Sequence, residues 1–468
     1  TRFPIGLADR PDRQSREPLE LDLAVGGGVL AVGGPRSGRT TLLRSVLRSA
    51  TARLGPGELH VHVLETAGGD LSAEAAGLPH AGTTIGGGDA FRTVRLLERL
   101  NREVDARRAA PPGTPTPLVL LLVDGVEAAG ALLDEADPGR GSDGLLRLVR
   151  DGAAVGVTCV LTADRALPGG RLAAAARMRL LLPLPDRADY AVAGVPARAI
   201  PTHRPPGRAL LGEDAVECQL ALPGAPAPRL TDRGGAAAAS EPVRIVDLPG
   251  DPVVPADPLV ADVPGRRWRV TVGPGGDDGS LVGLDLDRTG GLLVVGPPRS
   301  GRTAALESIA RRLAAAGAEV AHLSPAYAAP PGGLPGHRLD AADPAAVLAW
   351  SESLRGRRGI LLADDLGPVA EHPGLAALPR TGAGSGIVLL AAGSAGQLTS
   401  HYQGPVAALR RARTGLLLCP GPADAEVLGI RMPRLPLPHR PGSGWLVTDG
   451  AAQRVQVART PPGPAPDR

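Results

Sequence analysis

Short apolar runs alternate with longer amphipathic stretches along most of this chain. A short run that is apolar throughout is typical of a buried strand, whereas apolar residues spaced by three and four positions are typical of a helix. In the N-terminal half the pattern predicts a helix over Phe91–Arg108 and the strands Val29–Val32, Leu59–Leu64, Leu118–Val123, Val157–Leu161 and Arg179–Leu182. Strands and helices that alternate in this way predict an α/β fold, with a mainly parallel sheet flanked by helices.

The C-terminal half repeats the alternation, with predicted strands at Leu292–Val295, Glu319–Leu323, Ile360–Ala363, Ile387–Ala391 and Gly415–Cys419. An internal duplication is the simplest interpretation. The stretch between the halves is rich in Pro, Ala and Gly, which is typical of a connector rather than of a packed core. We therefore predict a first domain over residues 1–225, a connector over 226–265 with one short strand at Val243–Leu248, a second domain over 266–460 and a disordered tail over 461–468.

Each half carries a glycine-rich loop directly after its first fully apolar strand and directly before a helix. Glycines allow backbone N–H groups to converge on phosphate oxygens, and the helix N-terminus adds the positive end of its dipole. The spacing therefore predicts two P-loops that bind ATP. The predicted nucleotide-binding residues are Gly33, Gly34, Pro35, Arg36, Ser37, Gly38, Arg39, Thr40 and Thr41 in the first half, and Gly296, Pro297, Pro298, Arg299, Ser300, Gly301, Arg302, Thr303 and Ala304 in the second.

Both loops carry Arg, at Arg39 and Arg302, where the usual motif has Lys. Arg keeps the positive charge but replaces a compact ammonium group with a wide planar fork. We expect nucleotide binding to survive and hydrolysis to be slow or absent, since losing one transition-state contact costs about 3 kcal/mol. A compositional origin is an equally open interpretation, because the chain contains no Lys at all.

Magnesium ligands are predicted from the strand ends and from the loops. Asp124 and Asp364 each end a buried strand, the position at which a P-loop protein places the carboxylate on the Mg²⁺ side. The hydroxyls of Thr40 and Thr303 are placed to ligate the same ion. A strand-end Asp also caps turns in many proteins, but the preceding phosphate loop favours the metal role.

The residue after each of these aspartates distinguishes the two halves. An active motor usually carries Glu there to orient the attacking water, whereas the first half has Gly125 and the second has Asp365. Asp365 is therefore the candidate catalytic base, and we expect any residual hydrolysis to occur in the second half. Glu127 is interpreted as a solvated residue at a helix start rather than as a substitute base.

Composition limits the partners. The chain has 468 residues, of which 43% are hydrophobic and 2% aromatic, so it is globular with cores of small aliphatic side chains. A net charge of +3 and the scarcity of aromatic residues predict only weak, sequence-independent contact with DNA. Three separated cysteines and the absence of a run of about 18 apolar residues fit a cytoplasmic chain. Because the first residue is Thr1 rather than Met, we interpret the chain as a fragment, with any membrane anchor upstream.

The chain resembles the tandem ATPase modules of the FtsK/SpoIIIE class, above all the EccC-type proteins of type VII secretion and related actinobacterial FtsK-domain proteins. Beyond the two loops, the segments that carry the resemblance are Gly6–Gln14, Leu78–Gly82, Phe91–Arg108, Pro205–Ala209 and Glu217–Leu222 in the first half, and Arg440–Val447 and Val455–Val457 in the second. The resemblance also places Thr162 where the family has a polar sensor of the terminal phosphate, with Gly393 near the corresponding place in the second half.

The resemblance implies two RecA-like P-loop domains that bind ATP and Mg²⁺ and that form a homo-oligomer or ring through the full-length protein. It further implies movement of a polymer, either a secreted protein or DNA, on the cytoplasmic side of a membrane, with secretion substrates or complex subunits as partners. The sequence departs from the family at Arg39, Gly125, Arg302 and the shortened stretch Ala326–Pro335, and only Thr460–Arg468 remains where a DNA-reading domain would follow. Two functions stay open: a slow ATPase motor module, and a nucleotide-bound scaffold that recruits substrates or subunits.

Overall fold

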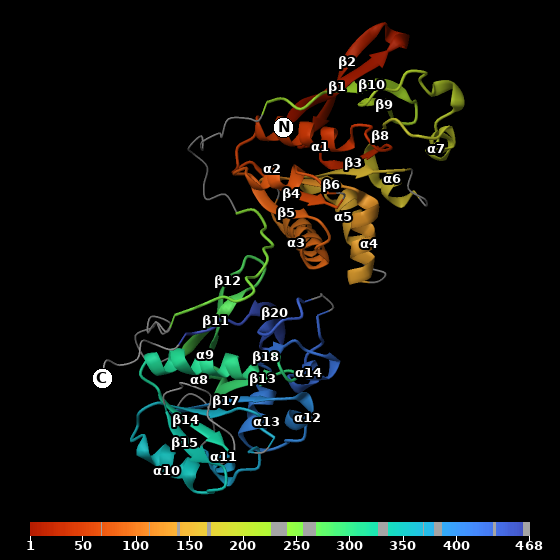
Figure 1. Ribbon diagram of the computed structural model, residues 1–468. Helices are drawn as coiled ribbons and strands as arrows, with labels where there is room; N and C mark the ends of the chain where they lie inside the picture. The colour runs from red at the N-terminus through yellow and green to blue at the C-terminus, as the bar shows by residue number, and fades with distance from the viewer. Residues whose placement is uncertain are drawn as a thin grey trace. The chain divides into compact units, whose positions relative to one another are not determined.

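The computed structural model describes residues 1–66, 68–111, 113–137, 141–165, 170–225, 241–255, 268–325, 336–367, 369–378, 386–433 and 437–461. The chain divides into two compact units, Thr1–Ile245 and Val246–Arg468 (Figure 1). Most of the predicted connector, the stretch Ala326–Pro335 and all but the first residue of the predicted tail lie outside the described residues.

The first unit is a ten-stranded sheet with helices packed against it. Its elements are β1 (Arg2–Arg10), η1 (Pro11–Arg13), β2 (Ser15–Asp22), β3 (Gly27–Val32), α1 (Arg39–Thr51), β4 (Leu59–Glu65), α2 (Leu71–Ala76), β5 (Ala81–Gly86), α3 (Ala90–Ala109), β6 (Leu118–Asp124), α4 (Val126–Ala136), α5 (Gly141–Asp151), η2 (Ala153–Val155), β7 (Val157–Ala163), α6 (Arg171–Ala175), β8 (Ala176–Leu181), α7 (Arg187–Val192), η3 (Ala197–Ala199), β9 (Arg208–Leu211) and β10 (Val216–Leu220).

The second unit repeats this arrangement. Its elements are β11 (Arg269–Gly275), β12 (Ser280–Asp285), α8 (Leu286–Thr289), β13 (Gly291–Val295), α9 (Arg302–Ala315), β14 (Glu319–Ser324), β15 (His337–Asp340), α10 (Ala346–Ser353), β16 (Gly359–Ala363), α11 (Pro373–Ala377), β17 (Ile387–Gly393), α12 (Ala395–Thr399), α13 (Gly404–Arg411), β18 (Gly415–Leu418), α14 (Pro422–Val427), β19 (Ser443–Thr448) and β20 (Ala451–Gln456).

The strand orders of the two sheets are identical once β11–β20 are matched to β1–β10. The first sheet runs β2-β1-β10-β9-β8-β3-β7-β6-β4-β5, and the second runs β12-β11-β20-β19-β18-β13-β17-β16-β14-β15. In both, the six strands from β8 to β5 or from β18 to β15 are parallel, and the remaining four pair antiparallel. The two units are therefore copies of one architecture.

Five of the six parallel strands in each unit are the ones that the apolar runs predict. The parallel edge strands β5 and β15 and the antiparallel strands escape that pattern. In the first unit the antiparallel part joins the two ends of the domain, because Gly6 of β1 pairs with Leu220 of β10. The short strand predicted at Val243–Leu248 is wrong, since this segment is irregular. Its carbonyls instead accept hydrogen bonds from side chains: Val243 O from Thr83, and Ile245 O from Arg92.

The core of each unit lies between the parallel sheet and the helix that follows the glycine-rich loop. On α1 the residues Leu42, Leu43, Val46 and Leu47 are buried against β-strand residues such as Val29. The matching face of α9 carries Leu306, Ile309 and Leu313. This packing fixes each helix N-terminus at the carboxyl edge of the parallel strands, where ligands bind in such sheets.

Arg312 of α9 is a buried cation inside the second core. It is 1% exposed, its Nε donates to Thr460 Oγ1 at 2.7 Å, and its Nη2 donates to Ala458 O at 2.7 Å. Its Nη1 donates to the carbonyl of Thr271 on β11. Burial lowers the pKa of Arg312 to about 10, so the side chain stays charged and ties the chain after β20 to the first strand of the same unit.

Candidate nucleotide site

The first glycine-rich loop joins β3 to α1 in a conformation that only certain residues allow. Arg36 has φ +60° and Gly38 has φ +109°, so successive backbone N–H groups turn toward one concave side. The loop is supported by Gly207, whose N–H donates to Ser37 O at 2.7 Å. A Cβ on Gly38 would lie 3.1 Å from the nitrogen of Gly207, so the close support requires glycine.

The second loop has the same geometry. Arg299 has φ +67° and Gly301 has φ +95°. Gly442 N donates to Ser300 O at 2.8 Å, and a Cβ on Gly301 would lie 2.9 Å from that nitrogen. The segments that carry the family resemblance at the end of each unit are thus the supports of the phosphate loops.

Unsatisfied polar atoms indicate what the loops are built to hold. The hydroxyls of Ser37 and Ser300 are buried, as is Nη1 of Arg302, and none of the three has a hydrogen-bond partner among the described residues. Buried polar groups without partners are rare in folded proteins unless a ligand or ion completes them. Because a guanidinium nitrogen is only a donor, any group that completes Nη1 of Arg302 must be an acceptor.

In the first unit the carboxylate of Asp124 lies beside the loop and is held on both oxygens. Thr40 Oγ1 donates to Asp124 Oδ2 at 2.7 Å, and Thr162 Oγ1 donates to Asp124 Oδ1 at 2.6 Å. The Thr162 hydroxyl also accepts the N–H of Gly125 at 3.0 Å. Asp124 is 5% exposed and Thr162 is fully buried, so the predicted Mg²⁺-side residues form one hydrogen-bonded chain.

Two further polar residues, Glu65 and Thr66, lie beside Asp124, and sequence reasoning did not identify them. Glu65 ends β4 directly beside Asp124 and is 1% exposed; its carboxylate accepts the backbone N–H groups of Leu71 and Ser72 at the start of α2. Thr66 Oγ1 donates to Asp124 O at 2.8 Å. The signal was available, because Glu65 ends a buried strand just as Asp124 does.

In the second unit Thr303 Oγ1 donates to Asp364 Oδ2 at 2.6 Å, which repeats the first contact. The second contact differs, because Asp364 Oδ1 accepts the backbone N–H of Asp365 at 3.1 Å instead of a Thr hydroxyl. In the first sheet Ala31 is aligned with Thr162, and at the same place in the second sheet Val294 is aligned with Ala392. The counterpart of Thr162 is therefore Ala392, one residue before the predicted Gly393, and its methyl group forms no hydrogen bond.

The position after each aspartate is left-handed in both units. Gly125 has φ +86° and Asp365 has φ +52°. This conformation favours Gly, with Asp and Asn next, and it disfavours longer side chains. The backbone thus gives a structural reason for Gly125, in addition to the loss of a base that the sequence indicates.

The carboxylate of Asp365, at the edge of the second sheet, accepts a hydrogen bond from Gln397. Gln397 Nε2 donates to Asp365 Oδ1 at 2.8 Å, while Gln397 Oε1 accepts the N–H of Ser394 at 2.8 Å and its hydroxyl at 3.0 Å. Because Ser394 fixes the amide orientation, the Gln397 NH₂ group is directed at the carboxylate. The candidate base is exposed on one side and held by an amide on the other.

Glu127 lies in the first turn of α4, as the interpretation of a helix-start residue requires, but it is not fully solvated. The side chain is half-buried, and its Oε1 accepts the backbone N–H of Asp164 at 2.9 Å, immediately after β7. Burial raises the pKa of Glu127, and the neighbouring carboxylate of Asp164 adds to the effect. Glu127 thus bridges the ends of two parallel strands at the edge of the sheet that carries Asp124.

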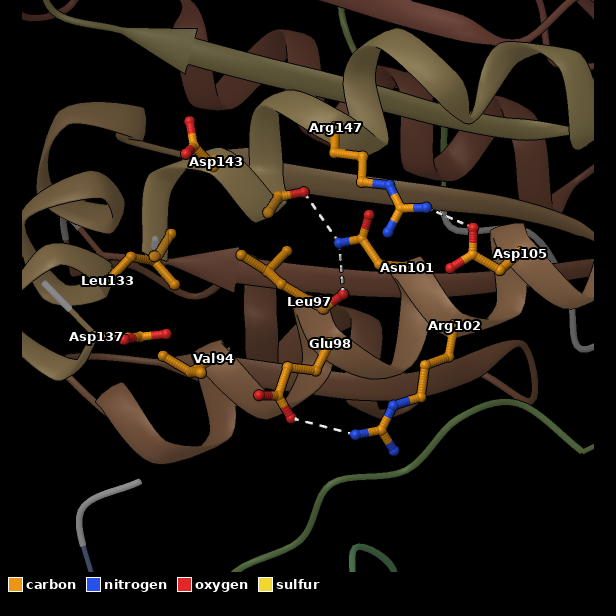
Figure 2. A pocket seen from close by; sticks show the side chains of 12 residues that line it. Val94, Leu97, Glu98, Asn101, Arg102, Asp105, Leu133, Asp137, Asp143 and Arg147 are labelled. Atoms are coloured by element: carbon orange, nitrogen blue, oxygen red, sulfur yellow. Dashed lines mark hydrogen bonds and ion pairs between the residues drawn. The ribbon is translucent and has the colours of Figure 1, made fainter. Parts of the chain in front are cut away.

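A separate hollow of about 500 Å³ lies between α3, α4 and α5 (Figure 2). Its charged rim is internally paired, Arg102 with Glu98 and Arg147 with Asp105. At its floor Asn101 Nδ2 donates to the carbonyls of Leu97 and Gly144. None of the predicted site residues lines this hollow, so it is no part of the nucleotide sites.

Two consecutive domains of the RecA-like P-loop fold are the class that these sheets and loops define, which confirms the predicted α/β class. The sequence model of the FtsK/SpoIIIE family matches residues 1–110, and the resemblance to this class is confirmed. The ESX-4 secretion system protein EccC4 of Mycobacterium tuberculosis is 29% identical over 98% of this chain and 40% of its own length. The chain therefore spans less than half of the length of that relative.

Solved structures show the same fold over nearly the whole chain. EssC (ATPases 2 and 3) from Geobacillus thermodenitrificans has a TM-score of 0.68 at 18% identity and covers 98% of this chain and 96% of its own. EccC (ATPases 2 and 3) from Thermomonospora curvata, in complex with a signal sequence peptide, has a TM-score of 0.58 at 23% identity, with coverage of 98% and 93%. Within the described ranges, no helix is both long and apolar enough to cross a membrane.

Proposed function

We propose that this chain is the tandem of ATP-binding modules in an EccC-type secretion protein, in which both loops hold Mg-ATP and the first site retains it rather than turning it over. The single observation that carries the proposal is the repeated loop geometry, with a Thr hydroxyl hydrogen-bonded to a strand-end Asp in both units. A bound Mg²⁺ would neutralise phosphate charge beside that pair.

In the first site the residues around Asp124 favour retention of Mg-ATP over its hydrolysis. Asp124 is held by Thr40 and Thr162 and is almost fully buried, which suits a fixed geometry around the ion. Arg39 supplies the charge for the phosphates. Gly125 offers no side chain that could accept a proton from water, so binding without rapid hydrolysis is the function that this residue set supports.

In the second site a weak hydrolytic activity is the better-supported role. Asp365 can accept a proton and orient water, although its carboxylate is shorter than that of Glu and is hydrogen-bonded to Gln397. Nη1 of Arg302, the first residue of α9, has no hydrogen-bond partner within the described part of the chain. The missing hydroxyl at Ala392 removes one contact that the first site makes, so we expect turnover to be slow.

A protein is the better candidate than DNA for the polymer that the complete secretion protein moves. The relatives are secretion proteins, and one of them was solved with a signal sequence peptide. The net charge of +3 supplies little of the general attraction on which DNA binding depends. We propose a place on the cytoplasmic side of a membrane complex, with secretion substrates, complex subunits or further copies of the full-length protein as partners.

The test measures ATP binding and phosphate release by the full chain. The double variant Arg302→Lys with Asp365→Glu restores the usual cation and a longer base, and it should raise phosphate release about tenfold or more. The matched variant Arg39→Lys with Gly125→Glu should stay near background, because φ +86° at Gly125 lies outside the left-handed region that residues with a Cβ adopt, whereas φ +52° at Asp365 lies within it.

A second function is a nucleotide-bound scaffold that recruits secretion substrates or subunits. The hydrogen bond from Gln397 to Asp365 favours this scaffold function, because a carboxylate that already accepts a hydrogen bond is a weaker base. If the second-site double variant binds ATP but leaves phosphate release at background, the motor role of this chain is refuted and the scaffold role remains.

A further inference from the structure

A cavity of about 270 Å³ lies beside the second phosphate loop, and apolar atoms form most of its surface. On one side it is lined by Gly301, Ala304 and Ser308, which lie three and four positions apart and so share one face at the start of α9. All three side chains are small, which leaves the space open. The cavity therefore begins at the phosphate loop itself and extends along its helix.

The opposite wall includes a segment from outside the sheet. Gly250 and Asp251 line the cavity, and they belong to residues 246–254, which we call the strap. The strap is held to the second unit by Arg440, whose Nη2 donates to Leu248 O at 2.7 Å, and by Arg459, whose N–H donates to Pro252 O at 2.8 Å. The Arg459 guanidinium also pairs with Asp251.

Arg440 connects the strap to the phosphate loop. Its Nε donates to Gln456 Oε1 at 3.0 Å, and the Gln456 amide in turn donates to Pro441 O at 2.9 Å. The next residue, Gly442, supports the loop through its hydrogen bond to Ser300 O. One turn thus holds both the phosphate loop and the strap, and the cavity lies between them.

We infer that this cavity receives the base half of a nucleotide held by the second loop, and that the strap is thereby a nucleotide-responsive element. The inference rests on the proposed binding of ATP at that loop. A flat, largely apolar base fits a small apolar cavity that opens at the phosphates. The guanidinium groups of Arg440 and Arg459 at the rim are suited to stack on a planar ring. A nucleotide that fills the cavity excludes water from Gly250–Asp251 and strengthens the hold on the strap.

The experiment compares Mg-ATP with Mg-tripolyphosphate, because both carry the triphosphate and only ATP carries a base. It uses the full chain with Arg39→Ala and Thr40→Ala, so that the second site dominates binding. Hydrogen exchange of the strap amides should slow with ATP and stay unchanged with tripolyphosphate. Equal protection by both ligands overturns the inference while leaving triphosphate binding intact.

A cavity-filling variant gives the second readout. Gly250 is exposed and has no left-handed φ, so Gly250→Leu adds a side chain at the cavity wall without backbone strain. The new Cβ would lie 3.3 Å from Nη1 of Arg440, whose flexible side chain lines the same cavity. It should weaken ATP binding about tenfold and change tripolyphosphate binding less than about twofold. The control Gly421→Leu adds the same side chain elsewhere in the unit, where the only atom within 4 Å of a new Cβ is Asp424 Oδ2 at 3.7 Å. Equal loss of both ligands in Gly250→Leu refutes the base cavity; if the parent chain binds neither ligand, the proposed function fails and this inference with it.

Discussion

Replacing Thr162 with Val tests whether the hydrogen-bonded chain around Asp124 organises the first unit. Val keeps the shape of Thr and removes only the hydroxyl, which in the native protein donates to Asp124 Oδ1 at 2.6 Å and accepts Gly125 N–H at 3.0 Å. A hydrogen bond to a charged group contributes about 1.5–3 kcal/mol, and an unsatisfied buried N–H costs about 1–3 kcal/mol. We therefore expect a loss of about 3 kcal/mol in the unfolding free energy of the first unit.

The distribution of tryptophan makes this measurable in the whole chain. All three Trp residues, Trp268, Trp350 and Trp445, lie in the second unit, and each is at least 94% buried. Denaturation followed by Trp fluorescence therefore reports the second unit, whereas far-ultraviolet circular dichroism reports both. Thr162→Val should shift the dichroism transition to lower denaturant and leave the fluorescence transition in place.

Thr158→Val is the matched control. Thr158 lies on the same strand and is 1% exposed, but its hydroxyl makes only a 3.5 Å contact with Leu23 O. Its replacement should cost less than about 1 kcal/mol, as expected for a weak neutral hydrogen bond. If the two variants shift the dichroism transition equally, the reasoning about Asp124 is refuted. A matching shift in fluorescence would likewise contradict it, because the effect would then not be confined to the first unit.

Four further outcomes are expected. Arg39→Ala should weaken ATP binding by the first site about tenfold, as measured by calorimetry, through loss of a charged phosphate contact. Arg312→Met should lower the unfolding free energy of the second unit by about 3 kcal/mol or more, seen by Trp fluorescence, since two carbonyls and the Thr460 hydroxyl lose their donor. Burial lowers the pKa of His62, a residue of β4, to about 3. The stability that the neutral imidazole contributes is therefore complete above pH 6.5 and is lost as the pH falls toward 3. The unfolding free energy should fall by about 2 kcal/mol between pH 7 and pH 5, and His62→Leu should lack this decrease. DNA binding should be micromolar or weaker and should fall steeply with salt in a filter or anisotropy assay, and tight sequence-dependent binding would contradict it.

Local sequence patterns were sufficient for five of the six parallel strands of each sheet and for the loops, but not for the edge strands β5 and β15. The run Leu118–Val123 is apolar at every position because both of its faces are covered, and the glycines after Val32 and Val295 mark the turn into a helix. The antiparallel half was not predictable in this way. The strand β1 finds its partner β10 more than 200 residues away, and no local pattern encodes that pairing.

The errors at the site have the same physical origin. Whether Ala392 or Gly393 matches Thr162 depends on strand register, which a one-residue slip changes and which the apolar run Ile387–Ala391 leaves undetermined. The left-handed φ at Asp365 and its bond to Gln397 arise from the turn after β16 and the start of α12, and these two segments are distant in sequence. The identities of most site residues could be predicted from the sequence. Their hydrogen-bond partners could not, because only the fold brings those residues together.

The pairing of the first strand of each unit with its last has a consequence for synthesis on the ribosome. The support of the first phosphate loop comes from Gly207, and β1 acquires its neighbour only when β10 is made, at Val216–Leu220. Until then the nascent chain carries an incomplete nucleotide site and an unpaired strand edge, which is a hazard for aggregation. In the second unit, likewise, the phosphate loop lacks its support until Gly442 is made, and β11 lacks its neighbour until β20 is made. Each unit should therefore bind nucleotide only after its last strand, β10 or β20, has been synthesised. A nascent chain that stops just before one of these strands leaves that unit unable to bind nucleotide.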